Sequence, residues 1–176
     1  MSEEIKHIEI SFNAEWFQPC YSVYLLTIKK SSKEVYYYIG QTGDRKHISA
    51  RSPFYRLMGH YSPYQGTDTQ LVKGLIKHKL INKAEGKSLR VCLETAFYNK
   101  HVEVKADYFK IRDFDEQTHL EKRILVEQVE QLMIDYFVKK GKTIFNNVHT
   151  NLIEKAKANE EAIVISKDII KLLKYK

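Results

Sequence analysis

The sequence has few cysteines and no long apolar run, and each absence excludes a class of protein. Only Cys20 and Cys92 occur, far apart and without a CxxC pair, which argues against a disulfide framework and a thiolate zinc site. No apolar segment approaches the roughly 18–20 residues that a membrane helix needs. The first residues lack the basic-then-apolar order of a signal peptide. We therefore expect a soluble, cytoplasmic protein that does not engage a membrane.

The sequence also lacks internal repeats, low-complexity tracts and an obvious interdomain linker. A chain of 176 residues, 43% of them hydrophobic, is long enough for one compact domain with a single core. Its 29 lysines and arginines against 22 acidic residues give a formal charge of +7, which favours an anionic partner such as nucleic acid or an anionic membrane surface. Because many proteins that bind no nucleic acid are equally basic, charge alone does not decide the function.

Two segments rich in β-branched and aromatic residues, 20–28 and 35–40, flank a polar turn and predict an antiparallel hairpin. Side chains alternate faces along a strand, so Tyr24, Tyr36 and Tyr38 share one face and the aliphatic residues share the other. We expect Tyr38 to meet Tyr24 across the hairpin. The hairpin thus has a core face and a face that carries phenols.

Two helices are predicted after the hairpin. Ser52 and Pro53 are suited to the cap and the first turn of a helix that runs to about His60. Asp68 is expected to cap a second helix, whose apolar residues recur at helical spacing as far as Leu80. This amphipathic helix is expected to pack on the sheet.

Alternating apolar residues predict a third strand over 89–97, and residues 98–114 stay undecided between strand and loop. Near the carboxyl end, residues 162–166 predict a short strand, and Ser166 is expected to cap a basic amphipathic helix. The predicted class is therefore an α+β fold, with a small antiparallel or mixed three-stranded sheet flanked by helices.

The longest predicted helix runs from about residue 116 to 139 and ends before Gly141. At 100° per residue, Glu130 falls inside its apolar arc. A charged carboxylate in the core is unfavourable unless it has a partner. Glu130 could form a buried ion pair with Arg123 or Arg56, or it could bind a ligand.

Five short motifs follow one another along the chain. They are SVY at 22–24, YIG at 38–40, RLMGH at 56–60, EQLMI at 130–134 and FN at 145–146. In this order they resemble the GIY-YIG nuclease superfamily, which includes homing endonucleases, some restriction enzymes and the incision domain of bacterial nucleotide-excision repair. The resemblance spans about residues 20–147, and it is specific because the motifs occur together on the expected elements.

The resemblance has two departures. Ser22 stands where the family usually has glycine, which is tolerable if the strand needs no positive φ at that position. The segment between the second and third motifs is long, so the arginine is a choice among Arg45, Arg51 and Arg56. We choose Arg56 because it lies on a predicted helix four residues before His60.

The resemblance implies an endonuclease that hydrolyses DNA phosphodiester bonds with one Mg²⁺ or Mn²⁺ ion held by Glu130. Arg56 would bind phosphate oxygens through its planar fork. Tyr24 or Tyr38 would accept a proton from water, provided that nearby cations favour the phenolate. His60 would shuttle or orient that proton.

Other residues are expected to support binding. Asn146 would tether the site by hydrogen bonds to phosphate or to backbone. The basic residues Arg45, Lys46 and Arg51, with aromatic residues interleaved, would contact DNA, although basic segments are usually just solvated surface. The substrate is duplex or branched DNA, and a homodimer stays open.

The expected organisation is an amino-terminal extension at 1–19, a GIY-YIG-like nuclease domain at 20–150 and a carboxyl-terminal extension at 151–176 in the same compact unit. The domain carries an insertion at about 61–118. This insertion and the long segment at 42–55 could supply loops that read a DNA sequence, which makes a site-specific, restriction-type enzyme the preferred interpretation.

Three alternatives remain. A catalytically inactive nucleic-acid-binding module would keep the fold and the basic cleft without cleavage. A structural or interaction domain would dock through the amphipathic tail at 163–175. A different nuclease fold is suggested by Glu103 and Lys105 in an ExK string after Glu94, but no Pro-Asp pair precedes it and it leaves the other motifs unexplained.

Overall fold

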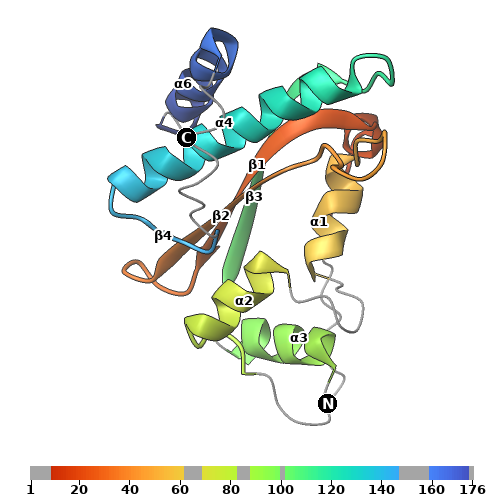
Figure 1. Ribbon diagram of the computed structural model, residues 1–176. Helices are drawn as coiled ribbons and strands as arrows, with labels where there is room; N and C mark the ends of the chain where they lie inside the picture. Colours follow the sequence, from red (N-terminus) through yellow and green to blue (C-terminus); the bar gives the residue numbers. More distant parts are fainter. Residues whose placement is uncertain (1–8, 62–68, 83–87, 100–101, 147–158, 175–176) are drawn as a thin grey trace.

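The computed structural model describes residues 9–61, 69–82, 88–99, 102–146 and 159–174, which form an α+β fold (Figure 1). The strands are β1 (Cys20–Lys29), β2 (Val35–Gln41), β3 (Glu103–Asp113) and β4 (Thr143–Ile144). The helices of the described part are η1 (Ala14–Phe17, a 3-10 turn), α1 (Pro53–Tyr61), α2 (Gln70–Lys77), α3 (Leu89–Asn99), α4 (His119–Lys139) and α6 (Glu160–Lys174).

The sheet has the strand order β3-β1-β2-β4. β1 pairs antiparallel with both β2 and β3, whereas β4 runs parallel to β2, so the sheet is mixed. The predicted α+β class is confirmed. The expected three-stranded sheet is wrong because the short strand β4 joins the free edge of β2.

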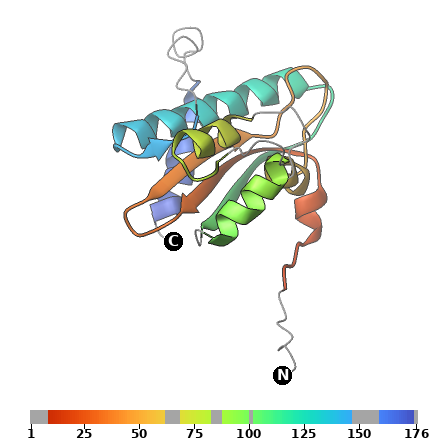
Figure 2. The same cartoon turned by 90° about the horizontal axis from the view of Figure 1, so that it is seen from below.

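The predicted hairpin is confirmed as β1 and β2, and helices cover both of its faces (Figure 2). α4 and α6 cover one face with an aliphatic core that includes Val23, Leu25 and Ile39. α2 and α3 cover the other face, where Tyr24 and Tyr38 lie in a second core. The division of side chains between the faces is as predicted, but the phenol-bearing face is also buried.

Helix α1 confirms the helix expected from Ser52, and α4 confirms the long helix expected before Gly141. Gly141 has a φ of 66°, a left-handed conformation that glycine adopts at little cost where a helix ends. The second predicted helix is α2, and its cap is Thr69, whose side chain accepts a hydrogen bond from the backbone N–H of Val72. The expected cap, Asp68, lies outside the described residues.

The strand predicted over 89–97 is wrong. Residues 89–97 form the helix α3, because the buried residues Cys92, Leu93 and Ala96 follow helical spacing while Val91 is exposed. The third strand is β3, in the undecided segment. It comes from the expected insertion at 61–118, which also supplies α2 and α3.

The tail prediction is also wrong. Residues 162–166 belong to α6, whose buried residues Ala162, Ser166 and Ile169 recur at helical spacing and face α4. Ser166 is therefore inside the helix and caps nothing; its hydroxyl donates to the carbonyl of Ile163. Among the described helices, none is both long and apolar enough to cross a bilayer.

Ser22 lies beside a register irregularity between β1 and β3, fully buried. Among the described residues, Lys79 is the one non-glycine residue with a positive φ, so the backbone at Ser22 does not require glycine. Its backbone N–H donates to the hydroxyl oxygen of Thr42 at 2.8 Å. Serine is therefore compatible with the strand at this position.

Candidate active site

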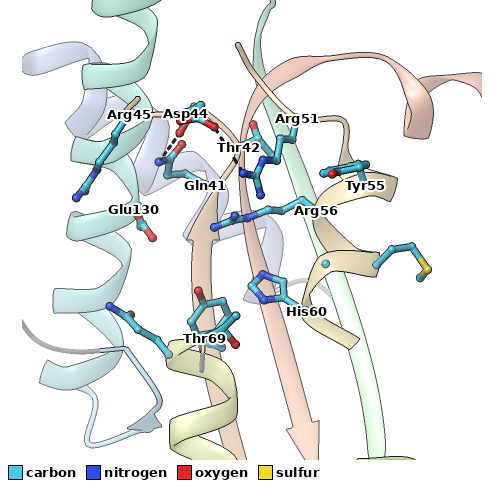
Figure 3. A pocket seen from close by; sticks show the side chains of 15 residues that line it. Gln41, Thr42, Asp44, Arg45, Arg51, Tyr55, Arg56, His60, Thr69 and Glu130 are labelled. Carbon is cyan, nitrogen blue, oxygen red and sulfur yellow. Dashed lines mark hydrogen bonds and ion pairs between the residues drawn. The ribbon is translucent and has the colours of Figure 1, made fainter. Parts of the chain in front are cut away.

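A pocket of about 740 Å³ opens between the end of β2, the segment that follows it, α1 and α4 (Figure 3). Six of the side chains expected at a site line it together. They are Tyr38, Arg45, Arg51, Arg56, His60 and Glu130. Because these residues come from four separate parts of the chain, the sheet and the two helices are what bring them together.

Tyr24 lies behind the residues that line the pocket, and none of its surface is exposed. Its hydroxyl is 3.0 Å from Nε of Arg56, which donates to it, and 2.6 Å from Nε2 of His60. The two rings of Tyr24 and Tyr38 are 6.3 Å apart between centroids. They contact each other as expected, but diagonally, since Tyr24 pairs with Gly40 in the β1–β2 register.

Steric contact with Tyr24 explains why the YIG motif has a glycine at position 40. A Cβ atom at Gly40 would lie 2.2 Å from the hydroxyl oxygen of Tyr24 and 2.3 Å from its Cζ. The Tyr24 ring is fully buried and cannot swing away into solvent. Glycine at this position lets the ring lie across β2 and reach His60 and Arg56.

The phenols are protonated in this site. Burial raises the pKa of Tyr24 well above its usual value, and the nearby Arg56 lowers it by less than burial raises it. Burial likewise raises the pKa of Tyr38. The expectation that Arg56 favours a phenolate is therefore not met by the protein groups alone.

His60 is neutral for the same physical reason. Burial, together with the smaller effects of the positive charges of Arg56 and Arg51, lowers the pKa of His60 to about 3. A neutral His60 can accept the Tyr24 hydroxyl proton at Nε2, which places its own proton on Nδ1. That Nδ1 atom is buried without a hydrogen-bond partner in the described structure.

Glu130 is half-buried on α4 and lines the pocket. Burial raises the pKa of Glu130 to about 7, against the opposing effects of Arg56 and Arg45. Neither ion pair considered for it forms: in the described part of the chain, Arg123 pairs with Glu127 at 2.8 Å and Arg56 bonds Tyr24. Its carboxyl group therefore faces the pocket, and no Lys, Arg or His among the described residues lies within ion-pair distance of it.

The donor set fits a Mg²⁺ or Mn²⁺ ion that keeps several of its waters. Such ions are often held through one or two carboxylates, and Glu130 is a pocket-lining carboxyl without an ion pair. Across the described ranges, there is no group of three or more His, Cys, Asp and Glu side chains that would form a closed protein cage. A single-carboxylate site is thus the kind of metal site that these residues can offer.

The arginines at the rim are each held by a carboxylate. Arg45 donates from Nε to Glu127 at 2.7 Å, and Arg51 lies 3.5 Å from Asp44. Asp44 was not expected at the site. Its Oδ1 accepts hydrogen bonds from the backbone N–H groups at positions 46 and 47, which lowers the pKa of Asp44. The turn that begins at Asp44 therefore carries both arginines to the rim of the pocket, where Figure 3 shows Arg51 beside Asp44 and Arg45 along α4.

Asn146 and Lys46 do not line the pocket. The side-chain amide of Asn146 donates to the carbonyl of Ile39 at 2.7 Å and accepts its N–H at 2.9 Å, so it continues the β4 ladder along β2. This is the expected backbone tether. Contact with phosphate has no support in the structure, because Asn146 is buried against β2 and does not line the pocket. Lys46 is exposed on the turn, outside the pocket wall.

Gln41, Thr69 and Gln70 also line the pocket and were missed from the sequence. Gln41 directly follows the YIG motif, and its Nε2 donates to the carbonyl of Gly43 at 2.9 Å. Its position after the motif was the one available signal. Nothing in the sequence placed the start of α2 beside α1 and α4.

The geometry gathers a guanidinium, an imidazole, a phenol and a carboxyl group in one basic pocket, above a buried tyrosine that bonds two of them. Comparison of the chain with protein-family models, with curated proteins and with solved structures gives no match. The interpretation of the site therefore depends on its geometry and on the order of its motifs.

Proposed function

We propose that this protein is a metal-dependent endonuclease that hydrolyses phosphodiester bonds in DNA. The observation that carries the proposal is the convergence of Tyr38, Arg56, His60 and Glu130 on one pocket with two further arginines. Phosphodiester hydrolysis needs charge neutralisation at the phosphoryl oxygens and a route for the proton of the attacking water. These four groups supply both in one place.

Arg56 is suited to bind the phosphate. Its Nε–H bonds Tyr24 at 3.0 Å, so the guanidinium is held in one orientation while the rest of its fork reaches across the pocket (Figure 3). A preorganised planar donor binds phosphate oxygens without reorganisation at the moment of reaction. Arg45 and Arg51 add positive charge at the rim, which attracts the polyanion.

Glu130 would hold the Mg²⁺ or Mn²⁺ ion. When bound, the ion supplies positive charge to the phosphate and to the departing oxygen. The carboxyl group must be ionised to bind it, and its pKa of about 7 means that proton and metal compete near neutral pH. Within the pocket, Glu130 and Arg56 face each other from α4 and α1 (Figure 3).

The tyrosines divide the remaining work. Tyr38 lines the pocket and is therefore the phenol that contacts the reacting groups. Tyr24 is a positioning residue, because it has no exposed surface and orients Arg56 and His60. The Tyr24 hydroxyl donates to Nε2 of the neutral His60, 2.6 Å away, so this hydrogen bond holds the two side chains in place.

A second candidate function is a nucleic-acid-binding module without catalysis. It is favoured by the raised pKa values of Tyr24 and Tyr38, which keep both phenols protonated in the protein alone. The same arginines would then bind phosphate without hydrolysis. Salt-sensitive DNA binding with no strand cleavage in Mg²⁺ or Mn²⁺ is the result that this candidate requires.

Incubation of supercoiled plasmid with the protein and Mg²⁺ or Mn²⁺ tests the proposal. Wild type should nick the plasmid, Glu130→Gln should lose detectable nicking, and Arg56→Lys should be slower by about 10²-fold or more. Glu121→Gln is the matched control, because it removes the same charge from an exposed position on the same helix, outside the pocket. Equal nicking by all four proteins, or none by wild type, would reject the proposal.

Site specificity is a finer part of the same proposal. The turn at 44–51 carries Arg45 and Arg51 to the rim of the pocket, so a duplex bound there would meet this turn. Sequencing the ends produced from a mixed DNA library distinguishes a restriction-type enzyme from an unspecific one. A recurring sequence at the ends supports the restriction-type interpretation, and random ends contradict it.

A further inference from the structure

One edge of the pocket is apolar and open. Tyr55, Met58 and Gly59 line it from α1, and Tyr55 and Met58 are 62% and 39% exposed. A Cβ atom added at Gly59 would meet no heavy atom within 4 Å, so the space at Gly59, one turn along the helix from Tyr55, is open. Residues three and four apart share a helical face, which makes these side chains one continuous surface.

This surface lies next to the cationic groups of the site. The guanidinium carbon of Arg51 is 5.8 Å from the centre of the Tyr55 ring, and Arg51 is itself paired with Asp44. Figure 3 shows Arg56 between Tyr55 on one side and Glu130 on the other. A ligand whose phosphate binds Arg56 therefore extends over Tyr55 in one direction and toward Glu130 in the opposite one.

The pocket is too large for a phosphate group alone. Its volume of about 740 Å³ lies within the range of pockets that hold whole small molecules. An aromatic ring with an exposed face, beside arginines, is the arrangement on which unpaired nucleobases stack. Bases in an intact duplex are already stacked on their neighbours, so only an unpaired base can use such a surface.

We propose that Tyr55, Met58 and Gly59 form a subsite for an unpaired nucleobase next to the phosphate that Arg56 binds. The subsite rests on the proposed function for its phosphate, and it narrows the substrate to DNA whose base at the cleavage position is unpaired, either in a single strand or in a locally opened duplex such as a supercoiled plasmid. Because Arg51 lies over one face of the Tyr55 ring, the base would stack on the other face. Because every base has a π-face, the subsite tolerates all four bases.

The test uses a single-stranded oligonucleotide that contains 2-aminopurine, whose fluorescence falls when the base stacks on an aromatic ring. EDTA is present, so that binding is measured without cleavage. Wild type should quench the fluorescence, and Tyr55→Ala should weaken binding on the order of 10- to 100-fold. Tyr55→Phe keeps the ring and should quench as wild type does.

Gly59 provides an independent arm that does not touch the ring. Gly59→Leu places a side chain in the unfilled space and should abolish quenching, whereas Gly59→Ala should leave most of it. Neither change meets a protein atom at Cβ, and both replace glycine by a better helix former, so thermal unfolding should show no loss of stability. The same 2-aminopurine in a perfect duplex should bind without the extra quenching.

Unchanged quenching in both Tyr55→Ala and Gly59→Leu, or a preference for the perfect duplex, would overturn the subsite. The two proposals fail separately. Quenching by a wild-type protein that never cleaves DNA would leave the subsite standing and reject the nuclease. Cleavage by wild type, Tyr55→Ala and Gly59→Leu at one rate, without quenching, would leave the nuclease standing and reject the subsite.

Discussion

Helices cover both faces of the sheet and both faces bury aliphatic side chains, but only one of them also buries a group of linked aromatic and polar side chains beside the pocket. The face under α4 and α6 is largely aliphatic, with Val23, Leu25 and Met133 fully or almost fully buried. The opposite face, which we call the aromatic face, also buries aliphatic side chains under α2 and α3, but near the pocket it buries aromatic rings with polar ends. Among these, the hydroxyl of Tyr108 and Nδ1 of His60 lack hydrogen-bond partners in the described structure.

The difference indicates that one face mainly stabilises the fold and that the other holds the side chains of the candidate site. Buried apolar contacts stabilise the fold without further requirements, whereas a buried polar group without a partner costs free energy. The aromatic face carries that cost where its strands reach the pocket. It is the face on which Tyr24, Arg56 and His60 are held together, so we expect mutations there to affect function more than stability.

The largest expected effect breaks the aliphatic face. Met133→Ala should destabilise the protein by about 2–5 kcal/mol, because Met133 is fully buried and leaves a cavity. Urea denaturation measures the loss. DNA binding per folded molecule should be unchanged, and a variant that binds less DNA while fully folded would contradict the separation of the two faces.

Gly40→Ala should damage the aromatic face at its tightest point. The new Cβ would fall 2.2 Å from the Tyr24 hydroxyl, so ring or strand must shift, at a cost of about 3 kcal/mol. The variant should also lose activity in its folded fraction, since Tyr24 orients Arg56 and His60. Gly59→Ala is the matched control for stability, because it adds the same methyl group where no heavy atom lies within 4 Å. Gly141→Ala is a poor control because Gly141 has a positive φ.

Glu130→Gln should change the pH dependence of stability in the absence of metal. A carboxyl group whose folded pKa of about 7 exceeds its unfolded value stabilises the fold at low pH and loses that contribution as pH rises through 7. Relative to wild type, the glutamine variant should therefore gain on the order of 2 kcal/mol between pH 5 and 8. Denaturation curves at both pH values measure this, and parallel behaviour of the two proteins would contradict the raised pKa.

The smallest expected effect compares one substitution at two stacked tyrosines. The rings of Tyr24 and Tyr108 lie 4.9 Å apart, but only the Tyr24 hydroxyl has partners among the described residues. Tyr108→Phe should stabilise the protein by about 1 kcal/mol, and Tyr24→Phe should destabilise it by about 1 kcal/mol. Equal changes of the same sign in thermal unfolding would contradict the assigned hydrogen bonds.

Local patterns predicted the hairpin and the helices that hold the site. The alternation of 20–28 and 35–40 identified β1 and β2, and the cap at Ser52 identified α1. The segment that forms the edge strand β3 was left undecided between strand and loop, and in the structure Asp107 is its one buried residue. The apolar residues of 89–97 fit the spacing of a strand and of a helix. The two are distinguished only by which of these residues are buried against the sheet, and that depends on the tertiary structure.

The sequence predicted which residues line the candidate site better than it predicted their hydrogen bonds and protonation. Tyr38, Arg56, His60 and Glu130 were named from motifs and line one pocket. Motifs did not reveal that Asn146 bonds the backbone of β2 through both ends of its amide. Such roles depend on distances between segments that are far apart in the chain.

By itself, the sequence determined which side chains are available and which face of each early strand and helix they occupy, because these follow from local periodicity. Tertiary structure alone decided that both faces of the sheet are buried, that Tyr24 lies behind the pocket while Tyr38 lines it, and that burial keeps His60 neutral and holds the pKa of Glu130 near 7. Protonation and exposure depend on what covers a group, and the covering helices come from distant parts of the chain.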